Sequence, residues 1–315
     1  MNLPFLESQI PEMIHPQMDV IVGDIKEYYK NEIFNISSEN TRLYGDHMST
    51  GALYSSYIYP LGGLEKVKAV SRYYCYWALI DDEFFDNSVD LDNITQTFEG
   101  FQATLNEAPE IEKTFVPIRE FCSRTDWTTE VKDIFRKEMN RYLESVLKLR
   151  TIEVQMKTVS LEEYLSYRAF DVAMNVIFSL TWYTQDDMPP SLYYSDEFEK
   201  IFEYGGISIG LLLDLYTLKS KKKEIRNYAH SIRIIQRVEN CKEEEAISKG
   251  VRLFYEYNAK LKEEFSRLEA KYPIAIQYFR YIQSGSVRYC NESREIRYKQ
   301  VDDIDENLVK GRTVL

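Results

Sequence analysis

Ala78-Leu79-Ile80-Asp81-Asp82-Glu83-Phe84-Phe85-Asp86 places four carboxylates at the end of an aromatic and apolar run that begins near Tyr73. In a helix, Asp81, Asp82 and Asp86 lie on neighbouring turns of one side, at offsets of four and five residues. Carboxylates beside apolar surface are tolerated mainly when a cation neutralises them. The cluster offers only oxygen ligands, which suit Mg²⁺ with its preference for carboxylates, water and substrate phosphates. A solvated acidic helix end has the same pattern, so the remainder of the chain decides between the two.

Helical periodicity dominates the chain on both sides of this stretch. Only 9 prolines and 12 glycines interrupt 315 residues, and no fixed-period repeat or hairpin signal occurs. Amphipathic segments predict helices over Pro16–Glu32, Gly63–Phe85, Leu91–Asn106, Ile111–Ser123, Thr128–Arg150, Leu161–Thr184, Glu197–Lys219, Lys223–Glu239, Lys242–Phe265 and Ala270–Tyr289. The breaks between them are too short for inter-domain linkers. We therefore predict an all-α protein, with one helical domain over residues 1–298 and a polar tail over 299–315.

The charge of the chain limits its partners. It carries 51 acidic and 39 basic residues, for a net charge of −12, and 44% of its residues are hydrophobic. No domain-wide basic footprint exists, which argues against nucleic acid as the main partner. An anionic substrate is still compatible, provided that metal ions or arginines neutralise it locally.

The cysteines and histidines form no recognisable motif. Cys75, Cys122, Cys241 and Cys290 are scattered, so neither a disulfide framework nor a zinc site is indicated. The three histidines are equally dispersed and favour no Ser-His-Asp or Cys-His site.

Targeting signals are absent from the pattern. The N-terminus does not resemble a signal peptide, and the most apolar run, Ile207–Leu213, is too short to cross a bilayer. We expect a soluble, cytoplasmic protein without a membrane span.

Arg168 and a cluster of arginines near the C-terminus are candidate anion ligands. Arg168 lies in an otherwise apolar helical stretch, where a guanidinium needs an anionic partner. A salt bridge to Asp171 at i+3 would satisfy that need without any ligand. Near the C-terminus, three arginines within ten residues end in Arg297-Tyr298. Guanidinium groups hold phosphate bidentately, although a basic segment of this kind is often only solvated surface.

Aromatic residues are abundant, with 25 tyrosines in the chain. Most of them are explained by helix packing. Tyr74 and Trp77 lie seven and four residues before Asp81 and share its helix face. This spacing predicts an apolar, ring-lined cavity beside the carboxylates.

Together these residues resemble the class I terpene synthases, over roughly Tyr54 to Tyr298. In that family the motif from Asp81 to Asp86 would be the aspartate-rich metal motif, and Arg168 would be the diphosphate sensor. The linker and effector positions of a helix break would fall at Asp171 and Val172. Arg297-Tyr298 would be the terminal pair that hydrogen-bonds the diphosphate.

The resemblance implies a Mg²⁺-dependent carbon–oxygen lyase that ionises an isoprenyl diphosphate. Farnesyl diphosphate is the default substrate, the product is a terpene hydrocarbon or alcohol, and a homodimer is possible. The family uses three ions, and the number here is left open. Asp81, with Asp82 and Asp86, would hold metal, and Arg168, Arg297 and Tyr298 would bind phosphate oxygens. Aromatic faces stabilise the carbocation in a dry cavity, and the candidate residues are Tyr74, Trp77 and Phe85, with Phe170 and Trp182 as weaker ones.

The second metal motif of the family departs from its pattern here. Its register falls on the nine residues 213–221, where Asp214 and Thr217 match, while Leu213 replaces the ligand asparagine and Lys221 the ligand glutamate. Leucine cannot coordinate a metal. Three outcomes stay open: Lys221 replaces an ion as a fixed charge on the diphosphate, Asp214 serves as a single ligand, or the protein binds its substrate without ionising it.

Two other functions compete with the cyclase. A prenyl-chain elongating synthase has a related fold but carries two aspartate-rich motifs. No second DDxxD motif occurs, and the run Asp302-Asp303-Ile304-Asp305 lies in the tail, past the helical body, which counts against elongation. A binding protein that has lost turnover is favoured by the degenerate second motif.

Overall fold

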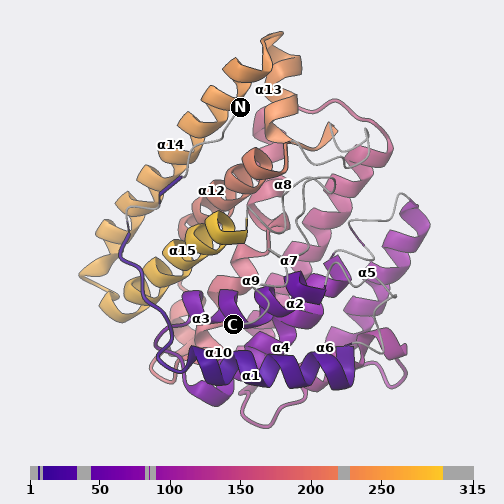
Figure 1. Ribbon diagram of the computed structural model, residues 1–315, viewed down its shortest axis with the longest axis vertical. Helices are drawn as coiled ribbons and strands as arrows, with labels where there is room; N and C mark the ends of the chain where they lie inside the picture. Colours follow the sequence, from indigo (N-terminus) through magenta and orange to yellow (C-terminus); the bar gives the residue numbers. More distant parts are fainter. Residues whose placement is uncertain are drawn as a thin grey trace.

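A computed structural model of the chain describes residues 6–7, 10–33, 44–81, 85, 90–218 and 228–293. Every regular element in these ranges is helical (Figure 1), as the sequence predicts. The α-helices are α1 (Met18–Tyr28), α2 (Tyr44–Ser49), α3 (Ser55–Ile58), α4 (Leu64–Ile80), α5 (Leu91–Leu105), α6 (Val116–Cys122), α7 (Thr129–Val154), α8 (Leu161–Asp171), α9 (Met174–Ser179), α10 (Thr181–Thr184), α11 (Pro190–Tyr193), α12 (Glu199–Thr217), α13 (Ser231–Glu239), α14 (Glu243–Glu269) and α15 (Pro273–Ser293). Two π-helical segments, η1 (Tyr29–Ile33) and η2 (Thr50–Tyr54), and the 3₁₀ turn η4 (Lys113–Phe115) join them.

Helix α4 lies inside the bundle and carries the apolar run before the acidic motif. Every residue from Tyr73 to Ile80 is buried, as expected for a helix that is covered on all sides. It packs against α1, α2, α6 and η2. This covering explains why the last two turns of the helix, from Tyr73 to Ile80, carry no charged side chain before Asp81.

Helices α8 and α12 approach each other unusually closely. A Cβ atom at Gly206 of α12 would lie 1.8 Å from the carbonyl oxygen of Ala169 in α8. Only glycine permits this separation, because any side chain would collide with the backbone. The contact fixes α8 against α12, and so places Arg168 beside Asp214.

The predicted single helix over Leu161–Thr184 is wrong, because the structure divides it into α8, α9 and α10. Ala173 has φ 57° and ψ 12°, a left-handed backbone that cannot continue a right-handed helix. A non-glycine residue adopts this conformation at a cost of about 1 kcal/mol or more. The break follows directly after Asp171 and Val172, at the position that the resemblance assigns to the linker and effector.

Local signals explain several helix ends. Thr128 and Ser160 accept hydrogen bonds from the backbone N–H groups of Val131 and Glu163 and so cap α7 and α8. The short elements between residues 44 and 58 were not predicted, because their side chains do not show a clear helical periodicity.

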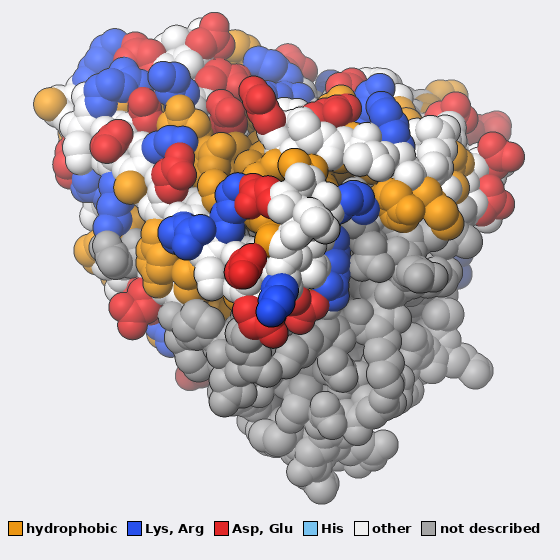
Figure 2. All heavy atoms as spheres, turned by 90° about the horizontal axis from the view of Figure 1, so that it is seen from above, with side chains coloured by type: hydrophobic (Ala, Val, Ile, Leu, Met, Phe, Trp, Pro, Cys, Tyr) orange, Lys and Arg blue, Asp and Glu red, His pale blue; other side chains and the backbone are white. Residues whose placement is uncertain are grey.

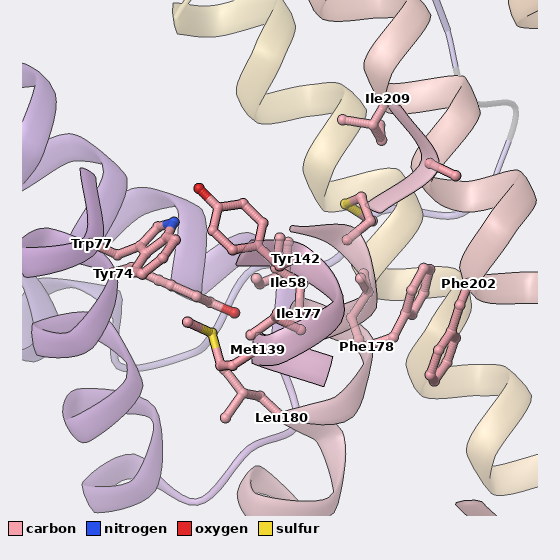
Figure 3. Close-up of a cluster of buried hydrophobic side chains, with 14 of the residues drawn as sticks. Ile58, Tyr74, Trp77, Met139, Tyr142, Ile177, Phe178, Leu180, Phe202 and Ile209 are labelled. Carbon is pink, nitrogen blue, oxygen red and sulfur yellow. The ribbon is translucent and has the colours of Figure 1, made fainter. Parts of the chain in front are cut away.

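The core is rich in aromatic rings (Figure 3). Phe178 and Phe202 stack with their centroids 5.3 Å apart and their planes 2° from parallel. All four cysteines lie in the described ranges and form no disulfide, as expected. Within those ranges, no helix combines the length and apolar character needed to cross a membrane.

The face drawn in Figure 2 carries Lys, Arg, Asp and Glu side chains intermixed, with apolar side chains between them. No large field of positive charge gathers on the part of this face that the structure describes.

Candidate active site

A cavity of about 260 Å³ opens at the end of α4 and is lined from α4, α7, α8, α12, α13 and α15. Segments far apart in the sequence therefore contribute to one site. The sequence-predicted residues that the structure brings to this cavity are Tyr74, Trp77, Asp81, Phe85, Arg168, Asp171, Val172, Asp214 and Thr217.

The inner wall of the cavity is aromatic. Tyr74 and Trp77 of α4 and Tyr142 of α7 lie together in Figure 3, and the rings of Trp77 and Tyr142 meet edge to face with centroids 4.7 Å apart. The aliphatic side chains of Ile177 and Ile209 complete this end. Such a surface excludes water and presents the negative faces of the rings.

The tyrosine hydroxyls of this wall are hydrogen-bonded to other protein groups. Tyr74 pairs with Tyr59 at 2.8 Å, and Tyr59 in turn donates to the carbonyl of Ile177 at 2.6 Å. Tyr54, from the π-helical segment η2, pairs with Ser286 at 2.9 Å. Because these hydroxyls satisfy one another, the cavity gains ring area without loose polar atoms that would hold water.

Asp81 lies at the rim, directly after the last residue of α4, and is partly exposed. The hydroxyl of Tyr142 donates to its Oδ1 at 3.1 Å. Burial, Asp81 and Asp171 hold the pKa of Tyr142 well above its usual value, so this phenol stays protonated and continues to donate. Tyr142 thus orients the first carboxylate of the acidic motif.

Arg168 reaches from α8 across to α12. Its guanidinium bonds Asp171 through Nη1 and the Oδ1 atom of Asp214 through Nη2, the latter at 3.0 Å. A Cβ at Gly210 would lie 2.7 Å from the Arg168 stem, so glycine clears the path of this side chain. Although burial alone would lower the pKa of Arg168, its charged and phenolic neighbours raise it well above the usual value. The guanidinium is therefore a permanent positive charge in the cavity wall.

Asp214 is only 2% exposed and accepts three hydrogen bonds. The donors are the Tyr164 hydroxyl at 2.7 Å, the Ser231 backbone N–H at 2.9 Å and Arg168. Burial raises the pKa of this carboxyl, but Arg168 and the two other donors outweigh it and hold the pKa below its usual value. Asp214 is ionised and surrounded by donors, so it would bind a metal ion only by exchanging one of them.

The donors facing the cavity fit a hard cation better than a soft one. Asp81 contributes a carboxylate and Thr217 a hydroxyl group. The Thr217 hydroxyl donates a hydrogen bond to the Leu213 carbonyl at 2.9 Å, so the lone pairs of its oxygen stay available to a cation. No cluster of three His, Cys, Asp or Glu side chains with metal-binding geometry occurs in the described ranges. Asp82 and Asp86 of the acidic motif fall outside those ranges.

Other predicted site residues lie elsewhere. The Phe170 ring does not line the cavity but packs under the Arg141 guanidinium, whose central carbon is 4.1 Å from the ring centroid. Trp182 is buried among Tyr193, Phe198 and Phe279, away from the cavity. The helix break after Asp171 changes the direction in which later side chains point. The helical spacing between Arg168 and Trp182 therefore could not predict whether Trp182 faces the cavity. Lys221, Arg297 and Tyr298 lie outside the described residues.

Sequence reasoning missed three side chains that organise the site: Tyr142, Tyr164 and His230. The two tyrosines lie in amphipathic helices, where their spacing resembles that of any core residue. His230 precedes α13 and lines the cavity. Burial and the nearby Arg168 and Arg233 lower the pKa of its imidazole, against an opposing effect of Asp214.

Comparison with known proteins agrees with this geometry. Residues 73–257, more than half of the chain, match the family model described as terpene synthase family 2, C-terminal metal binding. The chain belongs to this family. It is a class I terpene synthase by family and by fold, and the matched range contains the cavity-lining residues from Tyr73 to Arg233.

Solved terpene synthase structures share the fold at low sequence identity. The SVS_A2 protein from ancestral sequence reconstruction superposes with a TM-score of 0.81 at 15% identity, over 96% of this chain and 93% of that chain. Hedycaryol synthase in complex with nerolidol gives a TM-score of 0.75 at 14% identity, over 93% and 99%. At such identities the likeness establishes the architecture alone. No curated protein sequence matches the chain.

Proposed function

We propose that this terpene synthase is a Mg²⁺-dependent cyclase that ionises a linear isoprenyl diphosphate, with farnesyl diphosphate as the default substrate. The observation that carries the proposal is the two-ended cavity: Asp81 and Arg168 lie at its polar end, and Tyr74 and Trp77 at its aromatic end. An amphiphilic substrate with an anionic head and a hydrocarbon tail matches this division. The name of hedycaryol synthase supports the choice of a terpene product.

The residues would divide the reaction as follows. Asp81, together with Asp82, Asp86 and Thr217, would hold divalent metal, which when bound supplies positive charge to the departing diphosphate. Arg168 would bind phosphate oxygens from the opposite wall, with Arg297 and Tyr298 as further candidates. Tyr142 keeps the Asp81 carboxylate oriented through its hydrogen bond.

The tail of the substrate would lie against the aromatic wall. Its ring faces stabilise positive charge on carbon, and the paired hydroxyls leave little that could retain water near a carbocation. Whether the product is a hydrocarbon or an alcohol then depends on how the cavity admits the final proton acceptor or water.

The test is incubation of the purified protein with geranyl, farnesyl and geranylgeranyl diphosphate, each with Mg²⁺ and with chelator. We expect diphosphate release and a volatile terpene from farnesyl diphosphate in the presence of Mg²⁺, and neither with chelator. Formation of a longer prenyl diphosphate after addition of isopentenyl diphosphate would instead identify an elongating synthase.

A binding protein without turnover is the second candidate, and one observation favours it. Arg168 and Asp214 are already engaged with each other, and Leu213 at the cavity wall offers no ligand. Tight binding of farnesyl diphosphate without release of diphosphate would establish this alternative.

The assignment of residues 1–298 to one domain, the cytoplasmic location and a homodimer remain proposals. Analytical ultracentrifugation of the full chain tests the dimer.

A further inference from the structure

Three arginines among the described residues line the cavity, and each has a carboxylate partner. The guanidinium charges are therefore at least partly neutralised before any anion arrives. The pairs and their shortest nitrogen–oxygen distances are Arg150 with Glu153 at 2.5 Å, Arg168 with Asp214 at 3.0 Å and Arg233 with Glu243 at 2.7 Å.

His230 is a further basic side chain in the lining of this cavity, and it differs from the arginines. Both ring nitrogens are buried, and neither finds a hydrogen-bond partner within the part of the chain that the structure describes. A buried polar group left in this state costs about 1–3 kcal/mol. Such a group in a cavity wall is a candidate for a ligand that supplies the missing partner.

The backbone holds His230 in place. The residue is extended, with φ −150° and ψ 120°, and immediately precedes α13. The N–H of the next residue, Ser231, is bonded to Asp214 at 2.9 Å, and Ser231 is fully buried. Arg233, less than one turn further along, lines the same wall. The imidazole therefore lies at the Arg168–Asp214 end of the cavity, away from the aromatic wall.

This end of the cavity is also where the second metal motif is degenerate. Leu213 lies in the cavity wall at the position where the family pattern has a ligand asparagine. A substrate headgroup at this end would lack the neutralisation that a bound ion supplies there. A neutral imidazole has one N–H donor, and an imidazolium has two, so His230 can donate a hydrogen bond to the headgroup in either form.

We propose that His230 donates a hydrogen bond to the diphosphate group of the substrate and supplies part of the stabilisation lost with the second metal motif. The inference rests on the proposed function, because it assumes that the diphosphate binds at the polar end of this cavity. Binding would satisfy a polar group that finds no hydrogen-bond partner among the described residues.

The experiment measures the affinity of the full chain for inorganic diphosphate in the presence of Mg²⁺ by isothermal titration calorimetry, together with the unfolding temperature of the empty protein. His230→Phe keeps a ring of similar shape and removes both nitrogens. We expect the Kd for diphosphate to rise about 10-fold or more, as loss of a hydrogen bond to a charged group predicts. The unfolding temperature of empty His230→Phe should equal or exceed that of the wild type, because the variant no longer buries an unpartnered polar group.

Two further variants separate binding from folding. His230→Gln keeps an N–H donor and should retain most of the affinity. His15→Phe is the matched control, since His15 is a buried histidine outside the cavity, bonded to the Gly62 carbonyl and the Gln17 N–H, each at 3.1 Å. His15→Phe should lower the unfolding temperature and leave the diphosphate affinity unchanged.

The outcomes distinguish the inference from its premise. If the wild type binds diphosphate and His230→Phe binds it equally well, the role of His230 is overturned while the proposed function stands. A lower unfolding temperature for empty His230→Phe with unchanged affinity would likewise show a structural histidine. If the wild type binds no diphosphate with Mg²⁺, the headgroup site is overturned, and the proposed function with it.

Discussion

Asp81 and Asp214 are carboxylates in the walls of one cavity, but their surroundings differ. Asp81 follows the end of α4, is partly exposed and accepts a 3.1 Å hydrogen bond from Tyr142. Asp214 lies within α12, is buried and accepts hydrogen bonds from Arg168, Tyr164 and the Ser231 backbone. The α4 wall thus presents a carboxylate to a ligand, whereas the α8–α12 wall uses its carboxylate to hold an arginine. Identical residue types take different roles here because their burial differs: Asp214 is buried inside the bundle, whereas Asp81 lies partly exposed at the rim.

Removal of Asp81 should give the largest effect on activity. Asp81→Ala is expected to lower kcat by at least about 10²–10³-fold, because the site loses a group that stabilises developing charge. The cost in folding free energy should be only about 1 kcal/mol, that of one hydrogen bond at the rim. Product formation by gas chromatography and urea unfolding measure the two effects. Asp92→Asn, at an exposed carboxylate in the first turn of α5, is the control, and equal kcat in both variants would refute the metal role of Asp81.

Removal of Arg168 should lower stability as well as activity, in contrast to removal of Asp81, which should lower mainly activity. Arg168→Met keeps the length of the stem but leaves Asp171 and Asp214 without their cation. Breaking one side of a buried ion pair costs about 3–5 kcal/mol. Urea unfolding of the empty protein measures the change. A loss of less than about 1 kcal/mol in the free energy of unfolding would show that the Arg168 ion pairs stabilise the fold no more than the Asp81 hydrogen bond does.

The pH dependence of stability should reveal Asp214. Its pKa lies below the usual value in the folded protein, so its contribution is complete above the unfolded pKa of about 3.9. The contribution declines as the pH falls from there through the folded pKa. Asp214→Asn should therefore be destabilised relative to wild type at pH 7, and the difference should shrink below about pH 4. Denaturation at several pH values measures this difference, and a gap that stays constant down to pH 3 would contradict the assignment.

The smallest expected effect concerns the hydroxyl of Tyr142. Tyr142→Phe preserves the contact of the ring with Trp77 and removes the hydrogen bond to Asp81. We expect a loss of about 1 kcal/mol in stability, and about a 10-fold higher Mg²⁺ concentration for half-maximal activity, by analogy with groups that orient metal ligands. A Mg²⁺ titration of the initial rate measures the second effect. An unchanged Mg²⁺ requirement would show that Asp81 needs no orientation from α7.

The helical class and the position of the acidic motif followed from periodicity and local residue order, since both depend on residues within a few turns of one another. The spacing of Tyr74 and Trp77 before Asp81 also predicted correctly that they share a face, because α4 continues unbroken through them. Prediction failed where a helix was interrupted. The left-handed Ala173 separates Trp182 from the phase of Arg168. The helical periodicity does not show this break, although the family resemblance places one at Asp171 and Val172.

The amino-acid order of this chain was sufficient to specify an α-helical fold, an oxygen-rich acidic motif after an aromatic helix, and an arginine that needed an anionic partner. It could not specify which anion that would be. Asp171 was the visible candidate at i+3, but Asp214, 46 residues away, is a second partner. Contacts between distant helices depend on how closely the backbones approach, and here Gly206 and Gly210 set that distance. The hydrogen bonds of Asp214, and the lack of a partner for His230 among the described residues, therefore arise only when α8, α12 and α13 are packed together. Hydrogen-bond satisfaction is a property of the assembled surroundings.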